Sequence, residues 1–308
     1  MIFGKVSELD YREEILRLKE ERDACIVAHL YQRGEIQDIA DRVGDSFDLA
    51  RYCASTDKKV IVFCGVHFMA EGAKILSPEK TVLLPAIDAG CPMADMADVE
   101  GLRKLKERYP EAAVVSYVNT SAAIKAESDI CCTSSTAVKI VRSLPHKQII
   151  FLPDRNLGQY IAKHVPEKEF IFWAGFCPTH NALTVMHVEE ARAAHPGAVL
   201  AVHPETPPEV AELADFVGST KEIIEFCTQS DKKEFIIGTE EGVLHQLEKR
   251  NPGKRFHMLK YRFICPNMKK TTMEALYESL RDMKHEITLS DETARKARLS
   301  LERMLQVK

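Results

Sequence analysis

Short apolar runs alternate along this chain with amphipathic helical patterns. Residues 59–65, 147–153 and 234–239 are apolar runs without a polar face, a pattern typical of strands in a parallel sheet that is buried on both sides. Residues 11–23, 99–110 and 188–196 carry apolar residues at helical spacing instead. The alternation predicts an α/β protein built of three-layer αβα domains, each with a small parallel sheet.

The same pattern occurs three times. Each copy ends in Cys-Pro, at Cys91, Cys177 and Cys265, and these cysteines are 86 and 88 residues apart. Three further sets keep spacings of 85 to 88 residues: turns at Gly65, Pro153 and Gly238, strand ends at His29, Tyr117 and His203, and polar tips at Ser46, Ser134 and Thr220. Because several landmarks share one period, we interpret the chain as three homologous units.

The repeat predicts domains at residues 1–92, 93–178 and 179–267, related by pseudo-threefold symmetry around a central active site. Each unit is expected to read strand, helix, strand, helix, strand. Residues 268–308 continue as two helical patterns, which we expect to pack back on the first unit.

Composition and charge narrow the class of protein. Hydrophobic residues make up 45% of the chain and charged residues 29%, with a net charge of −4 and no basic block, which disfavours a nucleic-acid or membrane-surface partner. The N-terminus turns acidic at once and lacks the apolar core of a signal peptide. No window reaches the roughly 18 apolar residues of a membrane span, so a cytoplasmic protein is expected.

Polar residues gather where the first strand of each unit is predicted to end. In parallel sheets, sites form at the carboxyl ends of the strands, and the polar tips that follow can open helices whose backbone N–H groups bind an anion. If the three units surround one axis, these ends share a cavity suited to a small substrate with several carboxylates or a phosphate. The candidate residues are His29, Tyr31, Tyr117, Asn119, His203 and Glu205, with Ser46, Ser134 and Thr220 at the tips.

Three of the nine cysteines recur in register, and the other six do not. Three thiolates are one short of the four that close a structural zinc site or fill a cubane cluster. A [4Fe–4S] cluster held by Cys91, Cys177 and Cys265 would leave one iron open to substrate as a Lewis acid. The plainer alternative is three repeated core cysteines, and we interpret the remaining six as structural.

The chain resembles the quinolinate synthase family over nearly its whole length, from about residue 12 onward. The resemblance is carried, in order, by HLYQ, DIADRVGDS, FCGVHFMAE, CPMAD, YVNTSAAIKAESDICCTSS, PDRNLGQY, HPE, ADFVGST, GTEEG and CPNMKKTT. It implies that iminoaspartate, supplied by an iminoaspartate-producing enzyme, condenses with dihydroxyacetone phosphate to give quinolinate for NAD biosynthesis, with loss of phosphate and water. It also implies a [4Fe–4S] cluster on the three Cys-Pro cysteines.

The resemblance further implies a role for each candidate. Glu205 matches the family's general acid/base, and Tyr31 and Tyr117 match tyrosines that line and gate the cavity. The positions that grip substrate carboxylates and phosphate are matched by His29, Ser46, Tyr117, Asn119, Ser134, His203 and Thr220. Asn267, Met268 and Lys269 follow the last cysteine and are expected to surround the cluster ligands.

The chain departs from the family pattern at Leu30, which replaces Asn, at Thr206, which replaces Cys, and at Phe176 and Thr179 around the second cysteine. None of these is a predicted ligand or the predicted base. Leu30 therefore bears on local cavity shape more than on activity.

Two other functions are compatible with three recurring cysteines. A hydroxymethylbutenyl diphosphate reductase also combines three such domains with three cysteines and an open iron, although its own motifs are absent here. A cluster-based sensor or a zinc-bound structural protein is the second alternative, but neither would need Glu205. A repeat protein without any site would have its polar residues scattered along the chain, whereas here they gather at predicted strand ends.

Overall fold

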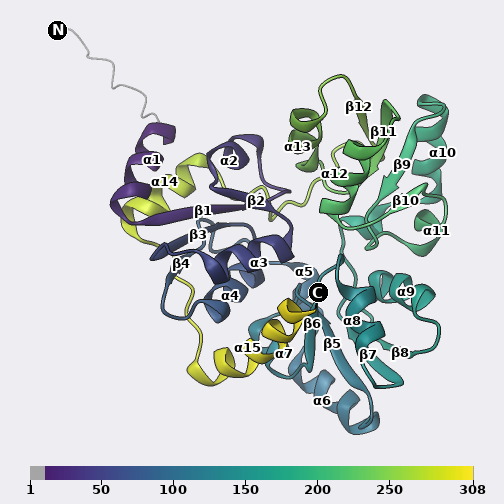
Figure 1. Ribbon diagram of the computed structural model, residues 1–308, viewed down its shortest axis with the longest axis horizontal. Helices are drawn as coiled ribbons and strands as arrows, with labels where there is room; N and C mark the ends of the chain where they lie inside the picture. Colours follow the sequence, from purple (N-terminus) through teal and green to yellow (C-terminus); the bar gives the residue numbers. More distant parts are fainter. Residues whose placement is uncertain (1–10, 308) are drawn as a thin grey trace.

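Three four-stranded parallel sheets, each covered by helices, form the computed structural model of this protein (Figure 1). The structure describes residues 11–307, and the N-terminal segment on which the expectation about a signal peptide rests lies largely outside this range. None of the helices within residues 11–307 combines the length and the apolar composition needed to cross a membrane.

The first unit has the strand order β2-β1-β3-β4. Alternate residues of its central strands enter two separate cores: Val27 and Ile61 lie in one, and Ile26 and Val62 in the other. This explains the continuous apolar runs, since both faces of the sheet are covered by helices. The elements are α1 (Tyr11–Glu21), β1 (Ala24–His29), α2 (Gly34–Ile39), β2 (Arg42–Gly44), α3 (Ser46–Ser55), β3 (Val60–Cys64), α4 (His67–Leu76), β4 (Thr81–Leu83) and, after Cys91, α5 (Pro92–Asp95).

The other two units repeat the strand order, as β6-β5-β7-β8 and β10-β9-β11-β12. The second contains α6 (Val99–Arg108), β5 (Ala113–Tyr117), α7 (Ala122–Ala126), β6 (Ile130–Cys132), α8 (Ala137–Ser143), β7 (Gln148–Leu152), α9 (Arg155–His164) and β8 (Glu169–Phe172). The third contains the short helix η1 (His180–Ala182), α10 (Val185–Ala194), β9 (Val199–Val202), α11 (Pro208–Ala211), β10 (Phe216–Val217), α12 (Thr220–Gln229), β11 (Glu234–Gly238), α13 (Val243–Arg250) and β12 (Arg255–Met258). The predicted α/β class with three αβα units is confirmed, whereas the pseudo-threefold relation between them stays a prediction.

The expectation of three strands per unit was wrong, because each sheet has four. The additional strands β2, β6 and β10 are edge strands of only three, three and two residues. Runs of two or three residues are too short to show the alternation of apolar and polar residues that marks a strand. These strands can be recognised only by their pairing with the neighbouring strand.

The two C-terminal helices differ in where they pack. Helix α14 (Met273–Asp282) lies against α1 and β3 of the first unit, as expected. Helix α15 (Asp291–Gln306) instead packs mainly against α7 and β6 of the second unit and also against α4 of the first. Its buried face, with Leu301 and Met304, joins a core that contains strands of both units, so α15 fastens the two together.

Candidate active site

One cavity of about 260 Å³ lies where the three units meet. Each unit contributes the loops that follow the carboxyl ends of its strands, which is where sites form in parallel sheets. All twelve residues singled out in the sequence line this cavity: His29, Tyr31, Ser46, Cys91, Tyr117, Asn119, Ser134, Cys177, His203, Glu205, Thr220 and Cys265.

Two histidines at equivalent strand ends are held in the same tautomer. The Nδ1 atom of His29 accepts the backbone N–H of Tyr31 at 3.1 Å, and Nδ1 of His203 accepts that of Glu205 at 3.3 Å. Burial lowers the pKa of both imidazoles to about 3. Both rings are therefore neutral at physiological pH with the proton on Nε2, which is left to donate a hydrogen bond.

Glu205 is a buried carboxylate held by donors from two other segments. The Tyr117 hydroxyl donates to its Oε1 at 2.7 Å, and His180 Nδ1 lies 2.9 Å from its Oε2. Burial opposes ionisation of Glu205, but the hydrogen bonds that His180 and the Tyr117 hydroxyl make to the carboxylate outweigh it, so the pKa of Glu205 lies below its usual range. Glu205 is therefore ionised at neutral pH.

Tyr31, in the wall of the cavity, connects the first unit to the third. Its hydroxyl forms hydrogen bonds with Thr220 Oγ1 at 2.8 Å and with Thr239 Oγ1 at 2.6 Å. Its carbonyl accepts Lys269 Nζ at 2.6 Å, and Lys269 also pairs with Glu240 at 2.9 Å. The position of Tyr31 thus depends on how these two units are docked.

Two of the three polar tips open helices at the cavity, since Ser46 and Thr220 are the first residues of α3 and α12. Ser134 instead lies in the turn before α8, which begins at Ala137. Asn119 also lines the cavity, and its buried Oδ1 has no hydrogen-bond partner among residues 11–307. An unpaired buried amide oxygen is costly, so this atom is available to a bound donor.

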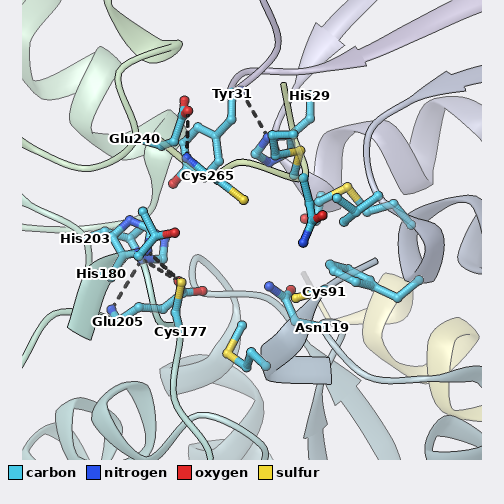
Figure 2. Close-up of a pocket in the computed structure, with 18 of the residues that line it drawn as sticks. His29, Tyr31, Cys91, Asn119, Cys177, His180, His203, Glu205, Glu240 and Cys265 are labelled. Carbon is cyan, nitrogen blue, oxygen red and sulfur yellow. Dashed lines mark hydrogen bonds and ion pairs between the residues drawn. The ribbon is translucent and has the colours of Figure 1, made fainter. Parts of the chain in front are cut away.

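The three Cys-Pro cysteines point into the same cavity (Figure 2). Among the nine cysteines these three alone are partly exposed, and the six interpreted as structural are all buried. Burial raises the pKa of the Cys91 thiol to about 12 and that of Cys177 and Cys265 above the usual value, so a bound cation is needed to hold them as thiolates. Soft sulfur donors converging on one space fit an iron–sulfur cluster.

Two further residues of the cavity were missed in the sequence analysis. His180 lies between Cys177 Sγ at 3.2 Å and Glu205, and its Nε2 is 3.0 Å from Thr239 Oγ1. Glu240 stands two residues after β11 and pairs with Lys269. The sequence offered one signal for each of them. His180 lies three residues after Cys177 in the CPTH segment, and Glu240 closely follows a predicted strand.

Most departures from the family pattern lie away from the cavity. Leu30 packs with Ala201 and Val243 in a core between the first and third units. Thr206 lines a separate groove, and Phe176 lies outside the cavity lining, whereas Thr179 is part of it.

Comparison with known proteins identifies one family. The profile of the quinolinate synthetase A proteins matches residues 13–306. The chain is 57% identical over 296 residues to a protein named quinolinate synthase from Caldicellulosiruptor saccharolyticus, covering 96% of this chain and 98% of the relative. Proteins of the same name from Alkaliphilus metalliredigens and Clostridium perfringens are 54% and 52% identical, covering 98% and 96% of this chain and 100% and 98% of those relatives.

Proposed function

Because the chain belongs to the quinolinate synthetase A family and is therefore an enzyme, we propose that it condenses iminoaspartate with dihydroxyacetone phosphate to quinolinate, releasing phosphate and water. The observation that carries this proposal is the convergence of three partly exposed cysteines and the buried Glu205 on one cavity. The product would enter NAD biosynthesis.

The cofactor in this proposal is a [4Fe–4S] cluster held by Cys91, Cys177 and Cys265. When bound, it supplies a Lewis acid, through an iron without a protein ligand, that assists the loss of hydroxide. Asn267 and Met268 line the cavity directly after Cys265, and Lys269 is held by Glu240, so these residues surround the last ligand.

Glu205 is the general acid/base in this proposal. It is ionised at neutral pH, lies within the cavity and moves the protons that isomerisation and dehydration require at its Oε1 or Oε2. The Tyr117 hydroxyl, 2.7 Å away, orients the carboxylate and lines the cavity together with Tyr31. In this proposal both tyrosines control the entry of the substrates into the cavity.

Substrate carboxylates and phosphate are bound by neutral donors. His29 and His203 donate from Nε2, and Asn119 supplies a side-chain amide beside them. The hydroxyls of Ser46 and Thr220 stand at helix starts, where backbone N–H groups favour an anion, and Ser134 lies just before α8.

We also propose a cytoplasmic location and a functional link to the enzyme that produces iminoaspartate. Iminoaspartate carries a hydrolysable imine, so a nearby source shortens its exposure to water.

The test uses full-length protein prepared without air. Wild-type protein is expected to contain iron and sulfide and to form quinolinate from the two substrates, whereas Cys177→Ser loses iron and product together. Colourless, iron-free protein after anaerobic reconstitution would contradict the proposal. A loaded protein that reduces hydroxymethylbutenyl diphosphate and forms no quinolinate would favour the alternative enzyme.

A further inference from the structure

One backbone hydrogen bond recurs beside the cysteine loop of all three units. Its acceptor is the carbonyl two residues before each cysteine, and its donor lies three residues after β3, β7 and β11. The pairs are His67 with Ala89 at 2.8 Å, Arg155 with Gly175 at 2.8 Å and Glu241 with Phe263 at 2.9 Å. Each loop is thus tied to its sheet by the main chain.

Two of the loops have a second anchor, made by a side chain. Asp154 and Glu240 stand two residues after β7 and β11. The Oδ2 atom of Asp154 accepts the backbone N–H of Cys177 at 2.9 Å, and Oε1 of Glu240 accepts that of Cys265 at 3.1 Å. A carboxyl oxygen therefore fixes the main chain of each of these cysteines.

The other oxygen of each side chain binds the start of the next helix. Oδ1 of Asp154 accepts the N–H of Leu157 in α9 at 2.8 Å, and Oε2 of Glu240 accepts that of Gly242, the residue before α13, at 2.7 Å. Both side chains are fully buried. Burying a carboxyl group is costly unless both oxygens are satisfied, and here the N–H donors come from the cysteine and the helix.

The first unit lacks this anchor. Val66 occupies the position two residues after β3 and packs in an apolar core. Among residues 11–307 no side chain accepts the backbone N–H of Cys91. The three loops therefore share the main-chain bond but differ in side-chain support.

We propose that Asp154 and Glu240 are positioning residues that hold Cys177 and Cys265 in the orientation required to bind the cluster, and that Cys91 is the ligand held least firmly. This inference rests on the proposed function, which makes the three cysteines cluster ligands. Asp154 is the cleaner test, because it does not line the cavity and Glu240 also pairs with Lys269.

Two substitutions of Asp154 test its hydrogen bonds to the N–H groups of Leu157 and Cys177. In Asp154→Ser, the hydroxyl can still cap α9, but the Cys177 N–H loses its acceptor. In Asp154→Asn, a single side-chain oxygen remains for the two N–H donors, so one of them loses its acceptor. Glu240→Gln tests the same rule at Cys265. The matched control is Asp98→Asn, because the Asp98 side chain caps α6 by accepting the Gly101 N–H at 2.7 Å and, among residues 11–307, accepts no N–H from a cysteine.

The first measurement is the rate at which anaerobically loaded, full-length protein releases iron to a chelator. Removing a residue that orients a metal ligand typically weakens binding by about 10- to 100-fold, so we expect release at least about tenfold faster in the Asp154 and Glu240 variants. Asp98→Asn should match the wild type. Release at the wild-type rate in all variants would overturn the inference.

The second measurement is the alkylation rate of individual cysteines in cluster-free protein, resolved by mass spectrometry. Asp154→Ser should accelerate alkylation of Cys177 and leave Cys265 unchanged, and Glu240→Gln should do the reverse. Equal acceleration at all cysteines would indicate general loosening and contradict a positioning role. If wild-type protein takes up no iron, the proposed function fails, while the alkylation pattern still decides this inference.

Discussion

Glu205 shows how a single buried residue sets the chemistry of the site. A carboxylate taken out of water is costly unless donors satisfy it, and Tyr117 and His180 supply them from other segments of the chain. His29 and His203, which line the same cavity, are kept neutral by burial. The cavity thus places the carboxylate of Glu205 beside neutral histidine donors, in keeping with the proposed proton transfer and anion binding.

Glu205→Gln removes the proton acceptor while preserving the size of the side chain. We expect turnover to fall by roughly 10²- to 10⁴-fold, the usual contribution of a general acid/base, with iron content unchanged. Steady-state quinolinate formation and iron analysis check this. Glu209→Gln, an exposed glutamate four residues on, is the control and should be fully active. Unchanged activity in Glu205→Gln would exclude the proposed role.

The buried histidines make stability depend on pH. Their pKa is about 3 in the folded protein against 6.5 when unfolded, so the unfolded chain binds more protons below pH 6.5. Stability is therefore present above pH 6.5 and is lost as pH falls toward 3, by about 1.4 kcal/mol for each histidine between pH 7.5 and 5.5. The lowered pKa of Glu205 acts only at lower pH, below its ordinary value of 4.5.

Urea unfolding of cluster-free protein at pH 7.5 and pH 5.5 measures this loss. His203→Gln should lose less stability over the same interval, since one of the two histidines no longer titrates. An equal change in the free energy of unfolding in the wild type and in His203→Gln would show that the His203 imidazole is not held neutral.

At the scale of elements, α15 packs mainly on the second unit, whereas packing on the first was expected. Its buried face contacts α7 and β6, and Ser300 donates from Oγ to the carbonyl of Lys125 at 2.8 Å. The helix therefore stabilises the second unit and its junction with the first, although it follows the third unit in the chain.

Leu301→Ala tests how much this packing contributes. Leu301 is 2% exposed, and removing such a side chain from a core typically costs about 2–5 kcal/mol through lost burial and the cavity left behind. Leu299 lies on the same helix at 52% exposure, so Leu299→Ala should change the free energy of unfolding by less than about 0.5 kcal/mol. Chemical denaturation compares the two, and equal effects would contradict the packing argument.

At the scale of the whole molecule, the site exists only as long as the three units stay docked. Gln37 donates to the carbonyls of Gln32 and Gly242, which joins the first unit to the third beside Tyr31. The approach is close because Gly242 has no side chain: a Cβ there would stand 2.7 Å from the carbonyl carbon of Tyr31.

Gly242→Ala should therefore move the two units apart and displace Tyr31. A misplacement of about 1 Å in a site can lower activity by about 10²-fold, and we expect a fall in kcat/KM of that order. Gly72→Ala, on α4 with nothing within 4 Å of the added Cβ, should leave kcat/KM unchanged. Wild-type kinetics in Gly242→Ala would show that docking at this contact does not position the site.

From the amino-acid sequence we could predict the αβα class, the threefold repetition, the strand-end position of the candidate residues and the three recurring cysteines. These features depend on local periodicity and constant spacing, which are written along the chain. The side-chain partners could not be predicted in this way: Tyr31 meets Thr220 across 189 residues, Tyr117 meets Glu205 across 88, and Asp154 and Glu240 reach the cysteine loops. The tertiary structure also decided that α15 packs on the second unit. Such contacts arise from the packing of separately formed units, and no local pattern encodes which surfaces will meet.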